Sequence, residues 1–147
     1  MNIRHAEIDD LDALEHLENA TFSYNRLSRR SLRYYVTGKT ATVLVAMQGG
    51  KLVAYGLVSF RKNSPIARLY SLAVAHAASG LGLGRRLLAE CEQTAIARGA
   101  RAMQLEVRED NAAAIRLYQA MGYREYERVE EFYEDDSTAI CFEKDLP

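Results

Sequence analysis

The sequence predicts an α+β fold with a mixed, mostly antiparallel central sheet flanked by helices on both faces. Three patterns support this prediction. β-rich runs alternate with amphipathic helical segments, Gly49-Gly50 joins two β-rich runs as in a hairpin, and the run ending at Val74 leads through glycines into a helix. With 147 residues, of which 48% are hydrophobic and 27% charged, the chain has the size and composition of one globular domain. We therefore expect a single domain over residues 1–147.

The first forty residues predict a strand followed by two helices. Residues 2–6 form the strand, and Asp9 or Asp10 is expected to cap the first helix. A second, short helix follows Ser28 and ends near Gly38, because glycine commonly follows the last turn of a helix. Apolar residues at helical spacing mark the buried side of the first helix: Leu11, Leu14, Leu17 and Phe22.

Three strands are expected next. Residues 41–46 and 52–60 are apolar, β-rich runs on either side of Gly49-Gly50, so they predict the two arms of the hairpin. Ser64-Pro65 predicts the following turn, and residues 67–74 predict the third strand.

The second half of the chain predicts two helices and three further strands. Residues 82–98 carry apolar side chains on one side and end at Gly99, which indicates a helix packed on the sheet. Residues 103–107 alternate as a strand, and Asn111 caps a helix that ends at Gly122. The last two strands are expected at 123–130 and 137–144.

Charge, hydropathy and cysteine content disfavour several classes of protein. The net charge is −1 with both signs interspersed, which disfavours a nucleic-acid-binding module. The first residues are polar, and no stretch approaches the ~18 apolar residues of a membrane span, so we expect a cytoplasmic protein. Cys91 and Cys141 lack metal-ligand spacing and are interpreted as buried free thiols. We expect no metal site.

The most informative segment is a strand followed by Gly80, Gly82 and Gly84 and then by a helix. Glycines let backbone N–H groups approach a ligand, and a helix N-terminus attracts phosphate. A Walker loop is excluded because Arg85 follows Gly84 where lysine is required. A dinucleotide fingerprint needs glycine or alanine at position 85 and is also disfavoured. Two interpretations of the segment remain: a loop that binds the diphosphate of coenzyme A, and a glycine-rich turn without a ligand.

This segment resembles the central Arg/Gln-x-x-Gly-x-Gly/Ala motif of the GNAT acyl-CoA N-acyltransferases. Gly82 and Gly84 occupy the glycine positions, whereas Ser79 stands in the Arg/Gln position. The resemblance implies acetyl-CoA as co-substrate, with its pantetheine arm paired to the main chain of the preceding strand. Ser79 cannot supply the long polar side chain, so weaker cofactor affinity is expected. The implied cofactor contacts are Leu72, Ala73, Val74, Gly80, Leu81, Gly82, Leu83, Gly84, Arg85 and Asn111.

A second segment, residues 105–123, contains a carboxylate and a tyrosine suited to acetyl transfer. The attacking amine must be neutral, yet a lysine with pKa ~10.4 is less than ~0.1% neutral at pH 7, and an α-amine near ~8 is roughly one-tenth neutral. A base therefore helps the amine, and an acid helps the departing thiolate. The segment resembles the RimI-like branch, the ribosomal-protein alanine N-acetyltransferases. That resemblance, which covers about residues 40–145, implies Glu106 as proton acceptor and Tyr118 as proton donor.

The acceptor side is less defined. By the same resemblance Tyr133 lines the acceptor channel, and a protein N-terminal α-amine is the favoured substrate, attacked directly in a ternary complex. A small amine or amino acid and a non-catalytic acyl-CoA-binding module remain as alternatives. The resemblance implies a monomer or a homodimer, and neither a nucleic acid nor a membrane is expected as partner. A basic run with tyrosines, which we interpret mainly as a solvated helix face, lies where the family builds its acceptor wall: Tyr24, Arg26, Arg29, Arg30, Arg33, Tyr34 and Tyr35.

Overall fold

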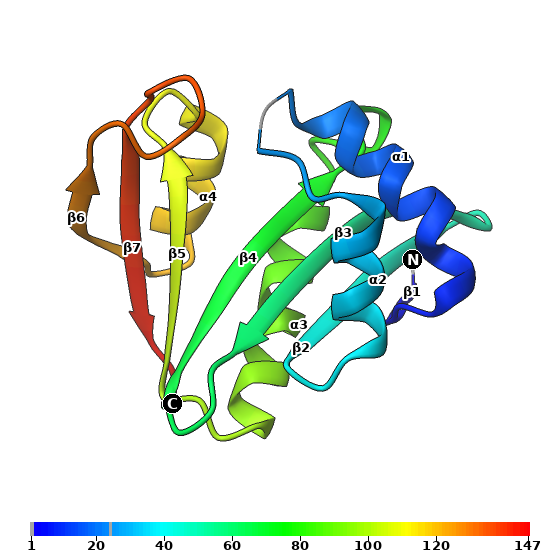
Figure 1. The fold of residues 1–147 in the computed structure, drawn as a ribbon, viewed down its shortest axis with the longest axis horizontal. Helices are drawn as coiled ribbons and strands as arrows, with labels where there is room; N and C mark the ends of the chain where they lie inside the picture. Colours follow the sequence, from blue (N-terminus) through cyan, green and yellow to red (C-terminus); the bar gives the residue numbers. More distant parts are fainter. Residues whose placement is uncertain (1, 24) are drawn as a thin grey trace.

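A seven-stranded sheet runs through the molecule (Figure 1) in the order β1-β2-β3-β4-β5-β7-β6. The computed structural model describes residues 2–23 and 25–147. All neighbouring strands are antiparallel except β4 and β5, which are parallel, so the predicted mixed, mostly antiparallel α+β fold is confirmed. The strands are β1 (Asn2–His5), β2 (Ala41–Gln48), β3 (Lys51–Phe60), β4 (Ile66–Val74), β5 (Ala102–Arg108), β6 (Arg124–Val129) and β7 (Ala139–Asp145).

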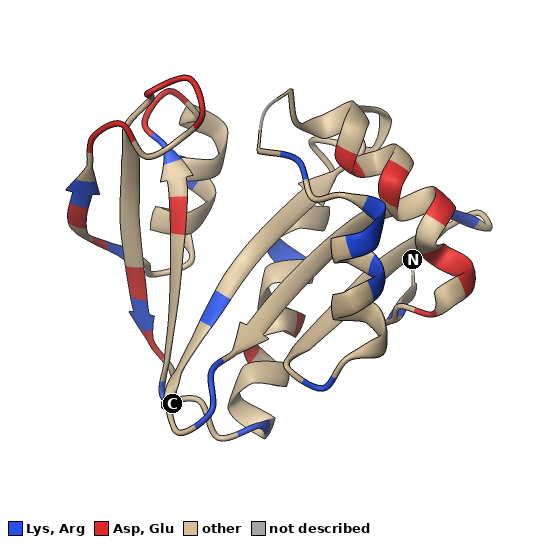
Figure 2. Cartoon of the chain, in the orientation of Figure 1, with Lys and Arg blue, Asp and Glu red and all other residues tan. Residues whose placement is uncertain are grey.

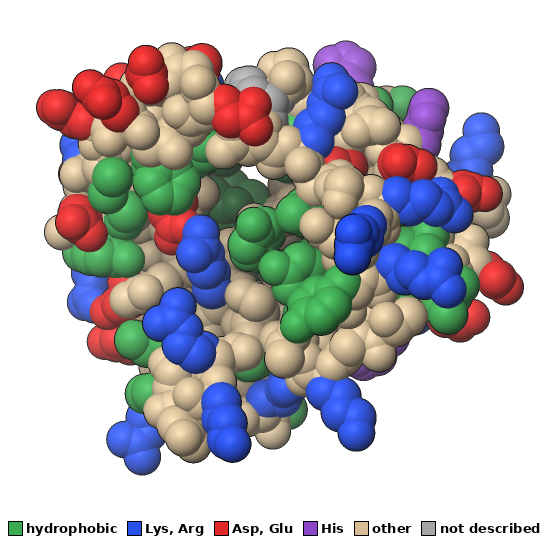
Figure 3. Space-filling view, viewed as in Figure 1, with side chains coloured by type: hydrophobic (Ala, Val, Ile, Leu, Met, Phe, Trp, Pro, Cys, Tyr) green, Lys and Arg blue, Asp and Glu red, His purple; other side chains and the backbone are tan. Residues whose placement is uncertain are grey.

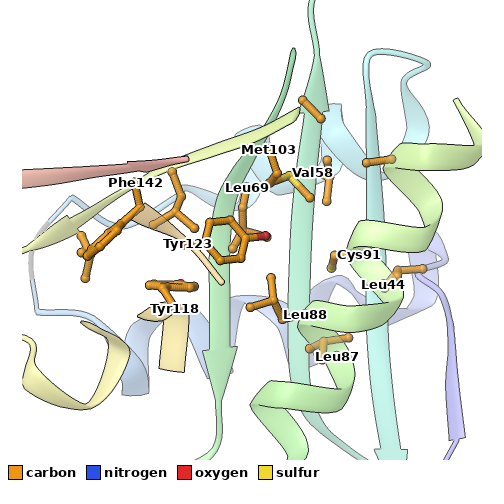
Figure 4. Close-up of a cluster of buried hydrophobic side chains, with 14 of the residues drawn as sticks. Leu44, Val58, Leu69, Leu87, Leu88, Cys91, Met103, Tyr118, Tyr123 and Phe142 are labelled. Atoms are coloured by element: carbon orange, nitrogen blue, oxygen red, sulfur yellow. The ribbon is translucent and has the colours of Figure 1, made fainter. Parts of the chain in front are cut away.

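Helices cover both faces of this sheet, as predicted (Figure 1). One face packs α1 (Leu11–Thr21) and α2 (Arg29–Thr37) over β2 and β3, and Tyr55 is the largest fully buried side chain in that layer. The other face packs α3 (Leu83–Ala97) and α4 (Ala112–Ala120). Figure 4 shows this second apolar layer, in which leucines of α3 point toward the strands. Two 3₁₀ turns are also present, at Ile8–Asp10 and His76–Ala78.

Asn111 caps its helix as predicted, and Ser28, after which a helix was expected, proves to be a cap as well. The Ser28 hydroxyl accepts from the N–H of Ser31 at 3.1 Å, and the Asn111 side-chain oxygen accepts from the N–H of Ala114 at 3.2 Å. Asp10 precedes α1 but does not cap it. Its carboxylate accepts from the N–H of Glu7 at 2.7 Å, because the 3₁₀ turn before α1 directs the side chain backward.

The parallel pair β4 and β5 separates after a short contact. Residues 66–68 pair with residues 102–104, and beyond them the two strands diverge (Figure 1). Tyr70 adds to this bend, because β3 pairs with β4 on either side of it and leaves it unpartnered as a β-bulge. The sheet therefore opens at the carboxyl ends of β4 and β5, between the loops that follow each strand.

Two further sequence expectations concern the helices and the cysteines. No helix within residues 2–23 and 25–147 is both long enough and apolar enough to cross a membrane. Cys91 and Cys141 are free and buried, which confirms the interpretation of these thiols.

Candidate active site

The opening between β4 and β5 contains a cleft of about 280 Å³. Figure 3 shows this face hollowed between the part of the chain that carries β5–β7 and the part that carries α1 and α2. In sheets with parallel strands, ligands bind where the strands part at their carboxyl ends. The cleft is lined by residues 69–72 of β4, residues 106–108 of β5, and residues of α1, α4 and the loop after β6. The predicted residues Leu72, Glu106, Asn111, Tyr118 and Tyr133 all line it.

The glycine loop after β4 presents backbone donors. Gly80 and Gly82 adopt left-handed φ values of +80° and +74°, and no atom lies within 4 Å of a Cβ placed at either position. Gly82 precedes α3 without a side-chain cap, and the N–H of Arg86 is the first to bond back to it, at 3.2 Å. The preceding N–H groups are thus available to an anion. Gly84 instead lies in α3, where a Cβ placed on it would lie 3.6 Å from side-chain atoms of Val74 and Leu117, an ordinary contact distance.

The residues on either side of the glycine loop fit the shape of coenzyme A, which has a diphosphate followed by an extended arm that contains amides. Leu72, Ala73 and Val74 lie on the stretch of β4 that has separated from β5, so among the described residues no strand pairs with the β5 side of β4 there. Arg85 is exposed in the first turn of α3 and adds positive charge near the loop. Leu81 is exposed, whereas the Leu83 side chain is buried, so Leu83 offers only its main chain.

Glu106 projects into the cleft from β5. Its neighbours Leu105 and Val107 are buried in the layer under α4, which places Glu106 on the opposite face, as the alternation predicts. The carboxylate forms an ion pair with the Arg68 guanidinium of β4, and its side chain is 14% exposed. Sequence reasoning missed Arg68, because it comes within reach of Glu106 only through the parallel register of β4 and β5, which aligns Arg68 with Gln104, two residues before Glu106.

Tyr118 reaches the cleft from α4. Its ring packs against Tyr123 and Phe142 with centroid distances of 5.7 and 6.3 Å (Figure 4). Burial raises the pKa of its phenol well above the ordinary value, and nearby Cys91 adds to this shift. The hydroxyl therefore keeps its proton at physiological pH and can act as a donor. The structure thus brings Glu106 and Tyr118 into one cleft, as predicted.

Two loops meet across the end of the cleft at Tyr133, the residue expected to line the acceptor channel. The N–H of Glu134, in the loop after β6, donates to the side-chain oxygen of Asn25 at 3.3 Å. Beside it, Tyr133 lines the cleft with its ring centroid 5.7 Å from the Arg108 guanidinium carbon. Arg108 is held in place by Asp135 at 2.8 Å. Tyr24, one of the tyrosines of the expected acceptor wall, lies outside the described residues.

Glu18 is a cleft residue that sequence reasoning missed. It is 2% exposed, and it accepts hydrogen bonds from the Tyr55 hydroxyl at 2.5 Å and from the N–H of Leu27 at 2.7 Å. The Tyr55 oxygen also lies 3.0 Å from the Ser71 hydroxyl. Glu18 thereby ties the loop before α2 to the sheet at the cleft. The available signal was a carboxylate on the apolar stripe of α1, one residue after Leu17.

The basic run of α2 behaves mainly as a solvated face, as interpreted. Arg29 pairs with Asp12 of α1 at 2.6 Å, and Arg30 and Arg33 are exposed. Tyr35 differs, because its ring lies 5.7 Å from that of Tyr70 and so contacts β4 beside the cleft.

Comparisons with known proteins agree with this geometry. Residues 10–123 match the model of the acetyltransferase (GNAT) family. The chain is 32% identical to an uncharacterized N-acetyltransferase of Methanocaldococcus jannaschii over 148 residues, covering 100% of this chain and 93% of that protein. It is 32% identical over 128 residues to the [ribosomal protein bS18]-alanine N-acetyltransferase of Escherichia coli, covering 81% and 78% of the two chains.

Solved structures share the fold. The crystal structure of the ribosomal-protein-S18-alanine N-acetyltransferase from Escherichia coli matches with a TM-score of 0.88 at 28% identity, covering 99% of this chain and 93% of that one. A putative acetyltransferase from Salmonella typhimurium, solved with its cofactor acetyl-CoA, matches with a TM-score of 0.86 at 22% identity, covering 100% and 94%.

Proposed function

Because the chain belongs to the GNAT family and is an acetyl-CoA-dependent N-acetyltransferase, we propose that its acceptor is the α-amine of a protein N-terminus. One observation carries the proposal: Glu106 and Tyr118 line a single cleft together with Leu72 of β4, the strand that leads into the glycine loop. The names of relatives support the acceptor class. They include an alanine N-acetyltransferase of a ribosomal protein and the catalytic subunit of an N-terminal acetyltransferase of Schizosaccharomyces pombe.

Acetyl-CoA supplies the reaction with an acetyl group activated as a thioester. We assign its diphosphate to the backbone N–H groups of residues 80–85 and to the charge of Arg85. Its amide-containing arm follows the main chain of residues 72–74, on the stretch of β4 that has parted from β5. Asn111, which caps α4 and lines the cleft, contacts the same ligand.

Glu106 and Tyr118 move the two protons of the reaction. Glu106 accepts the proton that the ammonium must lose before its nitrogen can form the new bond to the acetyl carbon. Tyr118 donates its hydroxyl proton to the sulfur as the carbon–sulfur bond breaks, and burial keeps that proton in place until then. The nitrogen loses a second proton as the amide forms, and proton exchange with solvent restores the Tyr118 hydroxyl. Arg68 holds the Glu106 carboxylate at the mouth of the cleft.

Transfer is direct and needs no acetylated enzyme. Cys91, which is on the helix after the glycine loop, lies in the core against β3 and is 0% exposed. Burial raises the pKa of its thiol to about 12, so the nucleophilic thiolate does not form. The acceptor amine itself attacks the thioester.

A thiol-release assay with acetyl-CoA tests the acceptor. We compare peptides that begin with alanine or serine, the same peptides with a blocked N-terminus and an internal lysine, and free small amines. The free N-terminal peptides should give the highest kcat/KM. Equal or faster turnover of the blocked lysine peptides or of the small amines would overturn the proposal that the acceptor is a protein N-terminus. No thiol release with any amine would indicate a binding module instead of an enzyme.

A further inference from the structure

We propose that the acceptor polypeptide carries acidic residues shortly after its N-terminus, and that these residues bind a basic groove leading away from the cleft. The inference rests on the proposed function, because it assigns the groove to the chain that follows the acetylated amine. It is carried by three observations: the groove is continuous with the cleft, its far part is lined by cations without acidic partners, and the opposite end of the cleft is acidic.

The groove begins at the reactive residues. A second depression of about 430 Å³ shares Tyr70 and Glu106 with the cleft and continues between α2 and β4. A third depression, of about 340 Å³, shares Phe60 and Arg61 with the second. A polypeptide whose amine lies at Glu106 thus has an open path toward the loop between β3 and β4. We call the second and third depressions together the tail groove.

The far part of the tail groove is basic. Four cations line it, and no acidic residue does. Within the described residues, none of the four forms an ion pair with a carboxylate, whereas Arg68 nearer the cleft is paired with Glu106. The Arg98 guanidinium donates to the carbonyl of Lys39 at 2.8 Å and lies over the Phe60 ring, so its partners are uncharged. The four cations are Lys39, Arg61, Lys62 and Arg98.

The other end of the cleft carries the opposite charge. Figure 2 places acidic residues in the loop between β6 and β7, which also contributes Tyr133 to the cleft. Figure 3 shows Asp and Glu side chains gathered above the hollow and Lys and Arg side chains along the lower edge. Such a field favours a ligand with a positive amino terminus and a negative tail. The acidic residues of that loop are Glu130, Glu131, Glu134, Asp135 and Asp136.

Strand geometry gives the position of the acidic residues. The register places Phe60 opposite Ala67, so Arg61 lies near the start of β4, whereas the cleft begins at Leu69 and Tyr70. Four residues of strand span about 13 Å, which an extended acceptor covers with about four residues. Tyr34, Tyr35 and Tyr70 line the intervening part. The acidic preference should therefore begin at about the fourth acceptor residue.

Three peptides test the groove. They share a serine N-terminus and two neutral residues, followed by a stretch of glutamates, glutamines or lysines. For the wild-type chain at low salt we expect kcat/KM to favour the glutamate tail over the lysine tail by about tenfold, mainly through KM, with less preference as salt rises. Lys62→Glu should lower this ratio by about threefold, and Arg61→Glu/Lys62→Glu should bring it near one.

Lys51→Glu is the matched control, because Lys51 is an exposed lysine at the start of β3, outside the tail groove. It should leave the ratio of the two tails unchanged. Equal turnover of all three peptides, or equal effects of Lys51→Glu and Lys62→Glu, would overturn the groove while leaving the proposed function intact. Failure to acetylate any peptide N-terminus would instead refute the proposed function.

A fluorescent single-stranded oligonucleotide provides the alternative ligand. If the preference for the glutamate tail is unchanged in the presence of saturating oligonucleotide, the groove is supported as a peptide site. The proposal would be overturned if the wild-type enzyme bound the oligonucleotide, lost that binding in Arg61→Glu/Lys62→Glu, and showed no preference among the peptide tails. These cations would then serve a nucleic acid.

Discussion

The two ends of the cleft are built in different ways. The glycine loop contributes backbone: Gly80 and Gly82 have left-handed φ values, and the α3 N-terminus has no side-chain cap. The end at which we place the acceptor contributes side chains from separate elements, with Glu18 on α1, Glu106 on β5 and Tyr133 after β6. A site made of contiguous backbone tolerates little variation of local conformation. A site made of distant side chains depends on strand register and loop contacts, and these can vary with the acceptor.

Glu106→Gln should have the largest effect at the side-chain end. We expect kcat to fall by about 10²- to 10³-fold, and further below neutral pH, because more of the amine is then protonated and needs a base. Single-turnover rates with a serine-starting peptide measure the change.

Glu143→Gln on the adjacent strand β7 is the control for Glu106→Gln. It removes the same charge from a carboxylate that pairs with Gln104 at 2.5 Å, and the cleft should keep its activity. Similar rates for the two variants would contradict the role of Glu106 as base.

Tyr118→Phe should have the second largest effect. We expect kcat to fall by about ten- to a hundredfold, with the KM for acetyl-CoA nearly unchanged, because the ring still packs and only the proton donor is lost. Since burial raises the Tyr118 pKa, the wild-type rate should not decline between neutral pH and pH ~10, the ordinary phenol pKa. A pH–rate profile of both proteins measures this.

Tyr123→Phe separates chemistry from packing. The Tyr123 hydroxyl donates to the buried Glu92 carboxylate at 2.7 Å, so its loss should cost about 1–3 kcal/mol of stability while activity remains. If Tyr118→Phe instead lost stability and kept its rate, Tyr118 would be a core residue only.

The contrast between the two ends explains how much the sequence could predict. The glycine loop lies within one short segment, so its glycines and the helix after it were found from local pattern alone. Glu106 was placed on the correct face because its neighbours Leu105 and Val107 alternate with it. Arg68 and Glu18 were missed, because the first depends on the register of β4 with β5 and the second on a buried contact with Tyr55. Local pattern also misassigned Asp10 as a helix cap, since the preceding 3₁₀ turn takes its carboxylate.

Gly82→Ala tests the backbone end and should have an intermediate effect. A side chain at φ +74° costs about 1–2 kcal/mol and adds a methyl group beside the N–H donors. We expect the KM for acetyl-CoA to rise by roughly tenfold, the equivalent of about 1.4 kcal/mol, with the peptide KM unchanged.

Gly49→Ala is matched to Gly82→Ala. Gly49 has a φ of +58°, and no atom lies within 4 Å of its Cβ position, so the backbone strain should be similar. Its stability should fall by a comparable amount while the KM for acetyl-CoA stays at the wild-type value. The same KM for both variants would mean that the glycine loop does not approach the ligand.

Glu18→Gln should have a smaller effect, confined to the acceptor. It weakens the charged acceptor that holds the Leu27 N–H and the Tyr55 hydroxyl, so the loop before α2 loosens. We expect a severalfold rise in the KM for peptide with kcat retained, and a loss of about 1–3 kcal/mol in stability.

Half-buried Glu15 on the same helix gives the control for Glu18. Glu15 forms an ion pair with Arg29 at 3.3 Å, and Glu15→Gln should change neither the KM for peptide nor the stability. A fall in kcat for Glu18→Gln without a change in peptide KM would place Glu18 in the chemistry instead of the acceptor wall.

Asp10→Asn should have no effect on either end of the cleft, and a small, pH-dependent effect on stability. Arg4, at 2.8 Å, and the Glu7 N–H lower the Asp10 pKa, so the native state holds this carboxylate ionised more strongly than the unfolded chain does. The resulting stabilisation is present above the unfolded pKa of about 3.9 and is lost as pH falls through the lower native pKa. Urea unfolding at neutral pH should show the variant less stable by about 1 kcal/mol, and the difference should shrink toward pH 3. Asp9 is an exposed neighbour, and Asp9→Asn should leave the free energy of unfolding nearly unchanged at either pH. If the stability lost in Asp10→Asn were the same at acidic pH as at neutral pH, the geometry of the turn, and not the charge of the carboxylate, would stabilise this corner of the fold.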